Sequence, residues 1–359
     1  MILNEEMNMQ EPFCPLPLRH GEHIVIGHGS GGFMTHELIK NIFQKYFSNP
    51  ILDQDNDAAL LEDFKGHSKY TQLVTSTDAH IVSPLFFAGG DIGRLAVCGT
   101  VNDVAMLGAE PRYLTASFII EEGFSMQTLE KIAISMQAAC QEAGVQIVAG
   151  DTKVTEKGKS DGLFISTTGI GWASRDLNIG GQCAQPGDAV IISGTLGDHG
   201  IAILEARGEL GFRSNIQSDV APLNKMVAAL LDEVSDIHVF RDPTRGGLAT
   251  SLVEISKQSR VTLQIEEESL PIQPAVRTAC ELFGFDPLYI ANEGKLIVIL
   301  PENQVDLALR ILHDQTYGKN AMRIGAVLSG SPGLVLLKTS LGSNRILDML
   351  AGEMLPRIC

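Results

Sequence analysis

Paired glycines and a following proline interrupt this sequence near its middle and divide it in two. Gly180-Gly181 and Pro186-Gly187 mark a boundary near residues 178–185. On either side, strand-like and helix-like segments mix without strict βαβ alternation. A chain of 359 residues is long for one domain and suits two. We therefore predict two α+β domains, over residues 23–178 and 183–340.

Two further segments flank these domains. Residues 1–22 contain Pro12, Pro15 and Pro17 with little periodicity, which predicts an extended arm whose role stays open. Residues 341–359 read as a short helical piece followed by Gly352 and Pro356, which favours a mobile tail ending in Cys359.

Composition excludes several classes of protein. The formal net charge of −16 argues against nucleic-acid binding, because phosphate contacts need clustered Lys and Arg. A nucleotide can still bind an acidic protein when Mg²⁺ lies between carboxylates and phosphates. The six cysteines have no CxxC or zinc-like spacing and form no disulfide scaffold. No apolar run approaches 18 residues and the N-terminus resembles no signal peptide, so we expect a cytoplasmic protein without a membrane segment.

A glycine-rich stretch, residues 28–32, comes just before a helical segment predicted over 35–47. Backbone N–H groups of such a loop can approach phosphate oxygens closely, and the helix N-terminus adds a positive end. A plain turn explains the stretch equally well. The candidate phosphate contacts are Gly29, Ser30, Gly31 and Gly32.

Four aspartates at strand ends or on apolar segments form a candidate metal set. They are Asp57, Asp78, Asp103 and Asp151. Taken singly, each is explained by helix capping or turn chemistry. Taken with the glycine-rich stretch, they suggest a nucleotide–Mg²⁺ site, because Mg²⁺ prefers carboxylate oxygens and phosphates.

The second half carries three further candidates. Arg241 and Arg245 flank an Asp-Pro-Thr stretch before paired glycines, which suits a triphosphate, an interdomain ion pair or a salt-bridged helix entry. Glu293 lies between apolar stretches and faces either a cleft or a simple turn. The terminal Cys359 thiol would be accessible and nucleophilic, although an inert last residue is the default.

Together, in this order, these motifs resemble the HypE family, the carbamoyl dehydratases of [NiFe]-hydrogenase maturation. The family belongs to the superfamily of aminoimidazole ribonucleotide synthetase and selenophosphate synthetase. The resemblance covers residues 24–359, and the final Pro356-Arg357-Ile358-Cys359 separates this family from its relatives. Its motifs here are residues 28–32, 56–59, 101–109, 150–154, 186–188, 193–200, 241–247 and 292–294.

The resemblance implies a fold and a site. The fold is a two-domain aminoimidazole ribonucleotide synthetase-like α+β fold with mixed and antiparallel sheets and a flexible C-terminal tail. The first domain would bind ATP and form a homodimer through its sheet. Asp57, Asp78, Asp103 and Asp151 would hold Mg²⁺. The ATP or phosphate contacts would be Gly29, Ser30, Gly31, Gly32, Asn102, Thr152, Arg241 and Arg245, and the catalytic residues Cys359, Lys153 and Glu293.

The implied activity is ATP-dependent dehydration of a thiocarboxamide on Cys359 to a thiocyanate, which supplies cyanide for the hydrogenase iron. Either Lys153 or Glu293 would be the general base. The implied partners are a HypF-type carbamoyltransferase as donor and a HypC–HypD-type iron carrier as acceptor. One alternative is a kinase or synthetase that phosphorylates a free small molecule, such as a thiamine-phosphate kinase or selenophosphate synthetase, for which Cys359 is dispensable. Another is a non-catalytic adapter whose tail docks on a partner.

Overall fold

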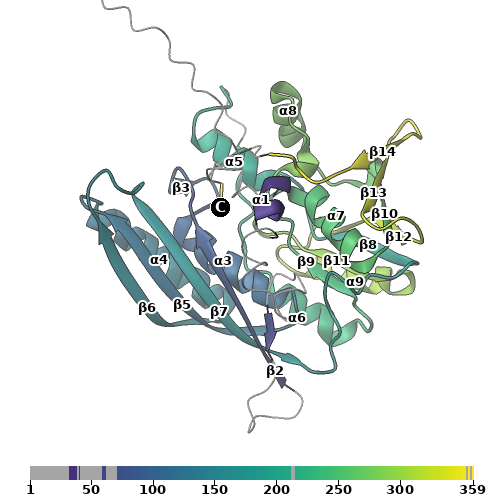
Figure 1. The fold of residues 1–359 in the computed structure, drawn as a ribbon, viewed down its shortest axis with the longest axis horizontal. Coiled ribbons are helices and arrows are strands. Elements are labelled where there is room, and N and C mark those ends of the chain that lie inside the picture. The colour runs from purple at the N-terminus through teal and green to yellow at the C-terminus, as the bar shows by residue number, and fades with distance from the viewer. Residues whose placement is uncertain are drawn as a thin grey trace, which may run out of the picture.

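The structure is a computed structural model and describes residues 32–38, 40, 59–61, 71–211, 215–352, 355 and 358–359. Each half of the described chain is built around its own β-sheet, and the two halves lie side by side (Figure 1). The predicted N-terminal arm lies outside the described residues, as do Gly29, Ser30, Gly31 and Asp57.

The first half contains a five-stranded sheet in the order β1-β2-β7-β5-β6. Only β5 and β6 run parallel, and the other neighbours are antiparallel. The strands are β1 (Ala59–Leu61), β2 (Thr71–His80), β5 (Glu110–Glu121), β6 (Gln146–Thr155) and β7 (Leu163–Ser174). Two helices, α3 (Ile92–Ala105) and α4 (Met126–Ala143), cover one face of this sheet (Figure 1).

Local sequence explains these helices. Asp91 caps α3 by accepting hydrogen bonds from the N–H groups of Gly93 and Arg94. The α4 helix begins after Ser125 and ends at Gly144, whose φ of 77° suits glycine. In β7, Gly169 lets α3 approach closely, since a Cβ there would lie 2.9 Å from Thr100 Cγ2.

Three small elements also belong to the first part of the described chain. A short helix precedes β1, and a two-stranded ribbon lies between β2 and α3. They are α1 (Phe33–Leu38), β3 (Phe86–Phe87) and β4 (Gly90–Asp91).

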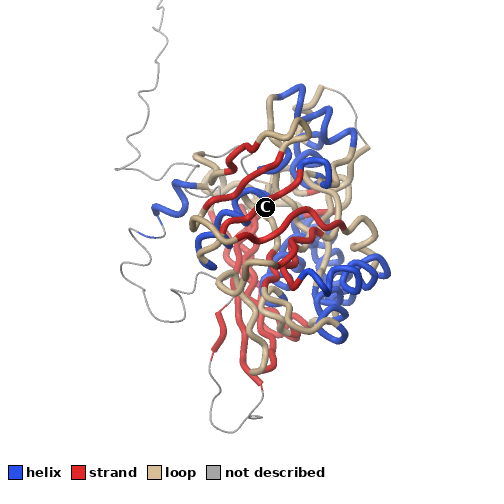
Figure 2. The backbone as a smooth tube through the Cα atoms, turned by 90° about the vertical axis from the view of Figure 1, so that its right-hand side faces the viewer, coloured by secondary structure: helices blue, strands red, loops and turns tan. Residues whose placement is uncertain are grey.

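The second half contains a seven-stranded sheet in the order β14-β13-β10-β12-β8-β11-β9. Its one parallel pair is β10 with β13. The strands are β8 (Asp188–Ile192), β9 (Val239–Arg241), β10 (Thr262–Glu266), β11 (Ile297–Pro301), β12 (Met322–Leu328), β13 (Leu334–Lys338) and β14 (Asn344–Leu347). Figure 2 shows the molecule with this half turned toward the viewer.

Helices cover both faces of the second sheet, so its central strands are apolar throughout. In β8, Val190 and Ile192 face the core with α7, while Ala189 and Ile191 face the core with α6 and α9. The helices are α5 (Asp198–Ala206), α6 (Asn224–Glu233), α7 (Gly247–Ser259), α8 (Pro274–Phe283) and α9 (Val305–Asp314). Three 3₁₀ turns are η4 (Glu267–Ser269), η5 (Pro287–Tyr289) and η6 (Glu302–Gln304).

Apolar packing joins the two halves. One hydrophobic core combines residues of α3 and α4 with Ile201 of α5 and with Leu355 and Ile358 near the C-terminus. None of the described helices is both long enough and apolar enough to cross a membrane.

The C-terminal segment differs from the sequence-based expectation. Residues 344–347 form strand β14 on the edge of β13, where a short helical piece was predicted. Unpaired backbone groups along β13 explain the difference, because they offer hydrogen bonds that a short helix lacks. Leu355 and Ile358 are buried, so the described end of the chain is packed against the protein in this structure.

Candidate active site

The last two residues pack between the halves of the chain. The Ile81 N–H donates to the Cys359 carbonyl at 3.1 Å, and Val82 forms an antiparallel bridge with Ile358. The marked C-terminus lies in the middle of the molecule in both ribbon views (Figures 1 and 2). The terminal thiol is therefore in a docked position.

Charged groups from both halves surround this thiol. The pKa of Cys359 is raised to about 12, chiefly by burial; Arg245 opposes this shift, and Glu293 and Asp78 contribute to it. Glu293 and Asp78 come from different halves of the chain, and both act on the thiol. The docked thiol is thus protonated at neutral pH and is a poor nucleophile in this position.

Glu293 is the most perturbed carboxyl of the site. It is 4% exposed, and its Oε1 atom has no hydrogen-bond partner among the described residues. Burial raises the pKa of Glu293 well above its ordinary value, and the negative charges of Asp219, Asp242 and Asp78 add to this. A carboxyl in such surroundings is a candidate acid–base group.

Two neighbours of Glu293 fix its position. The Asn292 side chain accepts from the Gly197 N–H at 2.8 Å and donates to the Pro243 carbonyl at 3.1 Å, which ties three loops together. Gly294 lies so close to Asp219 that a Cβ would meet the Asp219 carbonyl at 1.8 Å. The Asp219 carboxylate in turn accepts from the N–H groups of Glu293 and Gly294.

Arg245 reaches the thiol from the loop before α7. Its Nη2 lies 4.0 Å from Asp78 Oδ1, and the nearby Cys359 raises the pKa of the guanidinium most. The loop turns through Gly246 and Gly247, both with positive φ. Gly247 is required for a second reason, because a Cβ there would lie 2.5 Å from the Leu288 carbonyl.

Two predicted metal ligands lie on the same side of the first sheet. Asp78 projects from β2 toward α3, where Gly99 leaves room for it and for His80. Asp103 of α3 accepts from the Ser76 hydroxyl at 2.8 Å, two residues before Asp78 on β2. Both carboxylates also act electrostatically on Arg245. The structure therefore brings Asp78, Asp103 and Arg245 into one region.

Asp151 and Lys153 lie elsewhere in the chain. Across the sheet, Asp151 of β6 pairs with Ser117 of β5. Ser117 pairs with Ser166 of β7, and Ser166 pairs with Ala79 of β2, so Asp151 and Ala79 lie on the same face. Ala79 faces the side of the sheet opposite to Asp78, because neighbouring residues of a strand alternate. Asp151 and Lys153 form an ion pair at 2.7 Å with side chains 60% and 71% exposed.

This placement corrects two predictions for a single chain. Lys153 is not beside the docked Cys359, and Asp151 is not beside Asp78 and Asp103. Across the described parts of the chain, no group of three or more His, Cys, Asp or Glu side chains could hold a metal ion. The alternation of β6 puts Asp151 and Lys153 on the sheet face that the helices leave uncovered.

Three other predicted contacts have structural partners. Asn102 is buried; its amide donates to the Ala221 carbonyl at 3.0 Å and accepts from the Leu223 N–H at 2.8 Å. A Cβ on Gly32 would lie 2.2 Å from the Leu350 carbonyl, so this glycine allows α1 to contact the C-terminal segment. Arg241 pairs with Glu254 at 2.5 Å. The Thr152 side chain is not among those that the structure describes.

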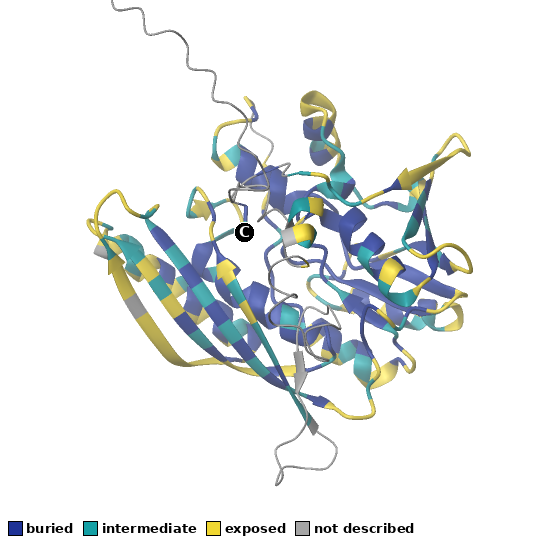
Figure 3. Cartoon of the chain, in the orientation of Figure 1, coloured by how far each residue is buried: buried dark blue, intermediate teal, exposed yellow. Residues whose placement is uncertain are grey.

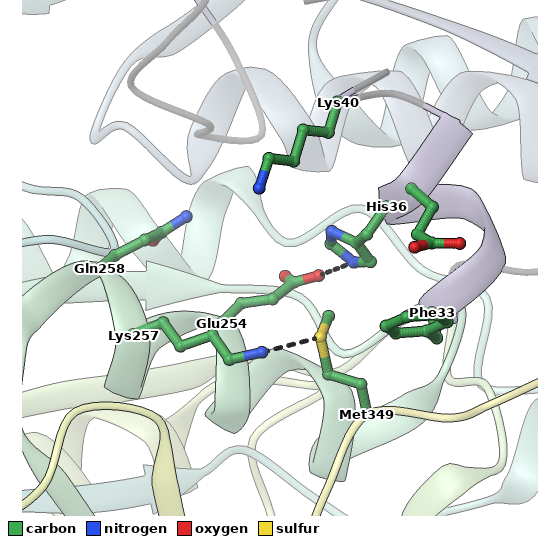
Figure 4. Close-up of a pocket in the computed structure, with 8 residues that line it drawn as sticks. Phe33, His36, Lys40, Glu254, Lys257, Gln258 and Met349 are labelled. Atoms are coloured by element: carbon green, nitrogen blue, oxygen red, sulfur yellow. Dashed lines mark hydrogen bonds and ion pairs between the residues drawn. The ribbon is translucent and has the colours of Figure 1, made fainter. Parts of the chain in front are cut away.

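The Arg241–Glu254 pair borders a cavity between α1, α7 and the C-terminal segment. Its volume is about 320 Å³, and Figure 4 shows His36 directed at Glu254 and Lys257 at Met349. The His36–Glu254 distance is 2.9 Å. Arg241 thus supports this cavity, whereas Arg245 faces Cys359.

Sequence reasoning missed four residues of this region: His80, His199, Asp219 and Asp242. Burial raises the pKa of Asp242 to about 6, although Arg241 opposes this. His199 stands in the quoted 193–200 motif, which could have pointed to it. Asp219 has no comparable signal, because only its spatial contact with Glu293 reveals it.

Comparison with known proteins identifies the chain's relatives. The family model for the N-terminal domain of AIR synthase related proteins matches residues 55–173. The family model for their C-terminal domain matches residues 185–336. Carbamoyl dehydratase HypE of Cupriavidus necator is 50% identical over 345 residues, covering 96% of this chain and 97% of the relative. The chain belongs to the HypE family. Carbamoyl dehydratase HypE of Escherichia coli K12 is 42% identical over 337 residues, which cover 94% of this chain and 98% of the relative.

Solved structures agree with this family. HypE in a HypE–HypF complex has a TM-score of 0.82 at 50% identity and covers 87% of this chain and 99% of that one. A HypE structure in complex with ATP has a TM-score of 0.78 at 50% identity, and the match covers 94% of this chain and 100% of that one. Thiamine monophosphate kinase of Aquifex aeolicus, at 18% identity and a TM-score of 0.62, shares the fold. The predicted two-domain fold is confirmed.

Proposed function

We propose that this chain uses ATP to dehydrate a thiocarboxamide on its own Cys359 to a thiocyanate, and so supplies cyanide for the iron of [NiFe]-hydrogenase. One observation carries the proposal. The terminal thiol of a member of the HypE family is docked against Glu293 and Arg245, so a group attached to that sulfur would meet both an acid–base residue and a cation.

The reaction must remove one oxygen and two N–H protons from S–CO–NH₂. In the first step the carbonyl oxygen attacks the γ-phosphorus of ATP and ADP leaves, while one N–H proton goes to a base. The product is an imidate phosphate, S–C(=NH)–OPO₃²⁻. In the second step the C–O bond breaks, phosphate leaves with that oxygen, and the second N–H proton is lost to give S–C≡N. Phosphorylation is needed because oxide is a poor leaving group, whereas phosphate is a good one.

Glu293 is the residue of this chain that takes the N–H proton. Its position at the sulfur and its raised pKa suit a group that must accept a proton near neutral pH. Arg245 supplies positive charge where the phosphoryl oxygens would lie. The sequence left the general base open between Lys153 and Glu293, and these observations support Glu293 as the proposed base.

Mg²⁺ fits the carboxylates of this site. Asp78 and Asp103 offer hard oxygen ligands on one side of the sheet, and Mg²⁺ commonly takes one or two carboxylates together with phosphates. When bound, the ion would neutralise phosphate charge during transfer. The glycine-rich residues 29–32 and Thr152 stay proposed phosphate contacts, and Asp57 a proposed metal ligand.

A homodimer would bring Lys153 and Asp151 to this site. Figure 3 shows that the edge strand β6 of the first sheet is largely exposed. On the uncovered face of this sheet, Tyr113 is 40% and Ile119 41% exposed. An unpartnered apolar sheet face favours pairing with a second copy. Asp151 and Lys153 lie on this face, so they would act on the ATP site of the opposite subunit.

Two external partners complete the proposal. A HypF-type carbamoyltransferase would load Cys359, which the relative solved as a HypE–HypF complex supports. A HypC–HypD-type iron carrier would accept the cyanide. We propose that both act on a tail released from the docked position and that the protein works in the cytoplasm.

ATP hydrolysis with and without the terminal thiol tests the proposal. A chain with Cys359→Ala should bind ATP normally, and adding carbamoyl donor should stimulate ATP hydrolysis only in the unaltered chain. Equal turnover by both chains with a free small molecule would indicate a kinase instead. Absence of ATP binding in both would indicate an adapter.

A further inference from the structure

His199 makes the contact that holds the last peptide of the chain. It is fully buried in the first turn of α5, and its ring stands edge-on to Phe87 with centroids 5.5 Å apart. Its Nδ1 atom lies 2.7 Å from the Ser218 hydroxyl. Its Nε2 atom is hydrogen-bonded to the carbonyl of Ile358, the residue before Cys359.

The partners determine where the imidazole proton lies. The Ile358 carbonyl can only accept, so Nε2 must carry the proton and donate. Burial lowers the pKa of His199, which favours the neutral ring. Nδ1 is then bare and accepts the Ser218 O–H. Ser218 itself is held by its own N–H, which donates to the Ala88 carbonyl at 2.7 Å, and its oxygen accepts from the Val220 N–H at 3.1 Å.

Two hydrogen bonds therefore bracket the terminal cysteine. His199 holds the carbonyl before Cys359, and the Ile81 N–H holds the carbonyl of Cys359 itself. Fixing the backbone on both sides leaves the thiol directed at Glu293 and Arg245. His199 contacts backbone and not the sulfur, so it positions the reacting group without touching it.

We propose that His199, oriented by Ser218, is the positioning residue that latches the C-terminal tail and aligns Cys359 for the reaction. The role of His199 in the reaction rests on the proposed function. Its hydrogen bond to the tail is present in the resting chain and does not depend on that function. A single latching hydrogen bond changes the docking equilibrium by a factor of about two to ten. That is enough to favour the docked tail and weak enough to release it to partners.

Alkylation of Cys359 measures the latch without ATP or carbamoyl donor. The docked thiol is protonated and partly buried, so iodoacetamide reacts mainly with the undocked tail. We would label the full-length chain and read the C-terminal peptide by mass spectrometry. His199→Phe keeps a ring against Phe87 but removes the donor, and should raise the labelling rate of Cys359 about two- to tenfold.

Matched variants separate the donor from the shape of the ring. In His199→Gln, the side-chain N–H stands the same number of bonds from Cα as Nε2 does, so labelling should return toward the rate of the unaltered chain. Ser218→Ala keeps the imidazole ring but no longer fixes which of its nitrogens carries the proton. The labelling rate of Cys359 should then be intermediate. Labelling of the half-buried Cys183, whose thiol contacts the Asn178 side chain and neither His199 nor Ser218, should be the same in every variant.

The outcomes decide the proposal. An unchanged Cys359 rate in His199→Phe, or an equal increase in His199→Gln, would overturn it. Should His199→Phe fail to fold, ¹⁵N-histidine NMR of the unaltered chain gives a second reading. The Nε2–H resonance of His199 should shift or disappear when the chain is shortened to residue 357, and an unaffected resonance would contradict the latch. Because no step requires catalysis, failure here is distinct from failure of the proposed function.

Discussion

The Glu293 carboxyl lies near the Cys359 thiol and raises the pKa of that thiol, although 65 residues stand between them in the sequence. Burial raises the pKa of both groups, which keeps the docked thiol protonated and makes the Glu293 carboxylate a stronger proton acceptor. A carbamoyl group on the sulfur would replace the thiol proton at this contact and would present its N–H₂ group to the carboxyl. The proposed proton transfer follows from that geometry.

Replacing Glu293 tests its role directly. Glu293→Gln keeps the size of the side chain but removes the base, so dehydration should slow by about 10²–10⁴-fold. ATP binding should be unchanged. The measurement is the single-turnover rate of thiocyanate formation on a pre-carbamoylated chain. Glu233→Gln, at the exposed end of α6, is the matched control and should react at the normal rate. Normal turnover of Glu293→Gln would remove this residue from the mechanism.

Asp242 gives a pH dependence of stability with a definite sign. Burial raises its pKa from 3.8 to about 6, so the folded state favours the neutral acid. Between these values the folded chain binds more protons than the unfolded chain, and stability therefore falls as pH rises. Asp242→Asn should lack this loss and should be more stable than the unaltered chain above pH 6, by roughly 2–3 kcal/mol. Denaturant melts at pH 4, near the lower end of this window, and at pH 7, above it, measure this. A stability difference that is the same at both pH values would contradict the prediction.

The proposed action of Lys153 across a dimer predicts subunit complementation. Asp78→Asn and Lys153→Ala should each abolish dehydration, with Asp78→Asn also losing Mg²⁺-dependent ATP binding. In a mixed dimer of the two variants, one site combines an intact Asp78 with an intact Lys153 from the opposite subunit. Statistical mixing should therefore restore about a quarter of the full activity. No recovery on mixing would show that Lys153 does not act across the interface.

Gly294 tests the close contact that positions Glu293. A Cβ there would lie 1.8 Å from the Asp219 carbonyl, so Gly294→Ala must displace one of the two loops. We expect a loss of about 1–3 kcal/mol in the free energy of unfolding, together with slower dehydration. Gly352→Ala, where a Cβ would meet nothing within 4 Å, should cost far less. Equal stability of the two variants, measured by urea melts, would contradict the argument.

The sequence was informative where chemistry is carried by local motifs. Asp78, Asp103, Arg245, Glu293 and Cys359 were all singled out from their neighbours in the sequence, and the structure brings them into one region. The face of the sheet on which a strand residue lies was not predictable in the same way. The face on which Asp151 and Lys153 lie depends on the register of β6 against β5 and on which helices cover the sheet, and neither is a local property.

Contacts between distant segments account for the remaining gaps. His199 meets Ile358 and Asp219 meets Glu293 only after both domains have folded, so no spacing in the sequence indicates these pairs. The β14 strand was mistaken for a helical piece because its pairing partner β13, and not its own propensity, determines its conformation.

The mass of the C-terminal peptide tests the central claim most directly. The full-length chain is incubated with a HypF-type carbamoyl donor and Mg·ATP, digested and measured beside Cys359→Ala. The account predicts that the unaltered peptide first gains one carbamoyl group and then loses one water with ATP, while the Cys359→Ala peptide does neither. A Cys359→Ala chain that becomes carbamoylated and loses water with ATP would contradict it.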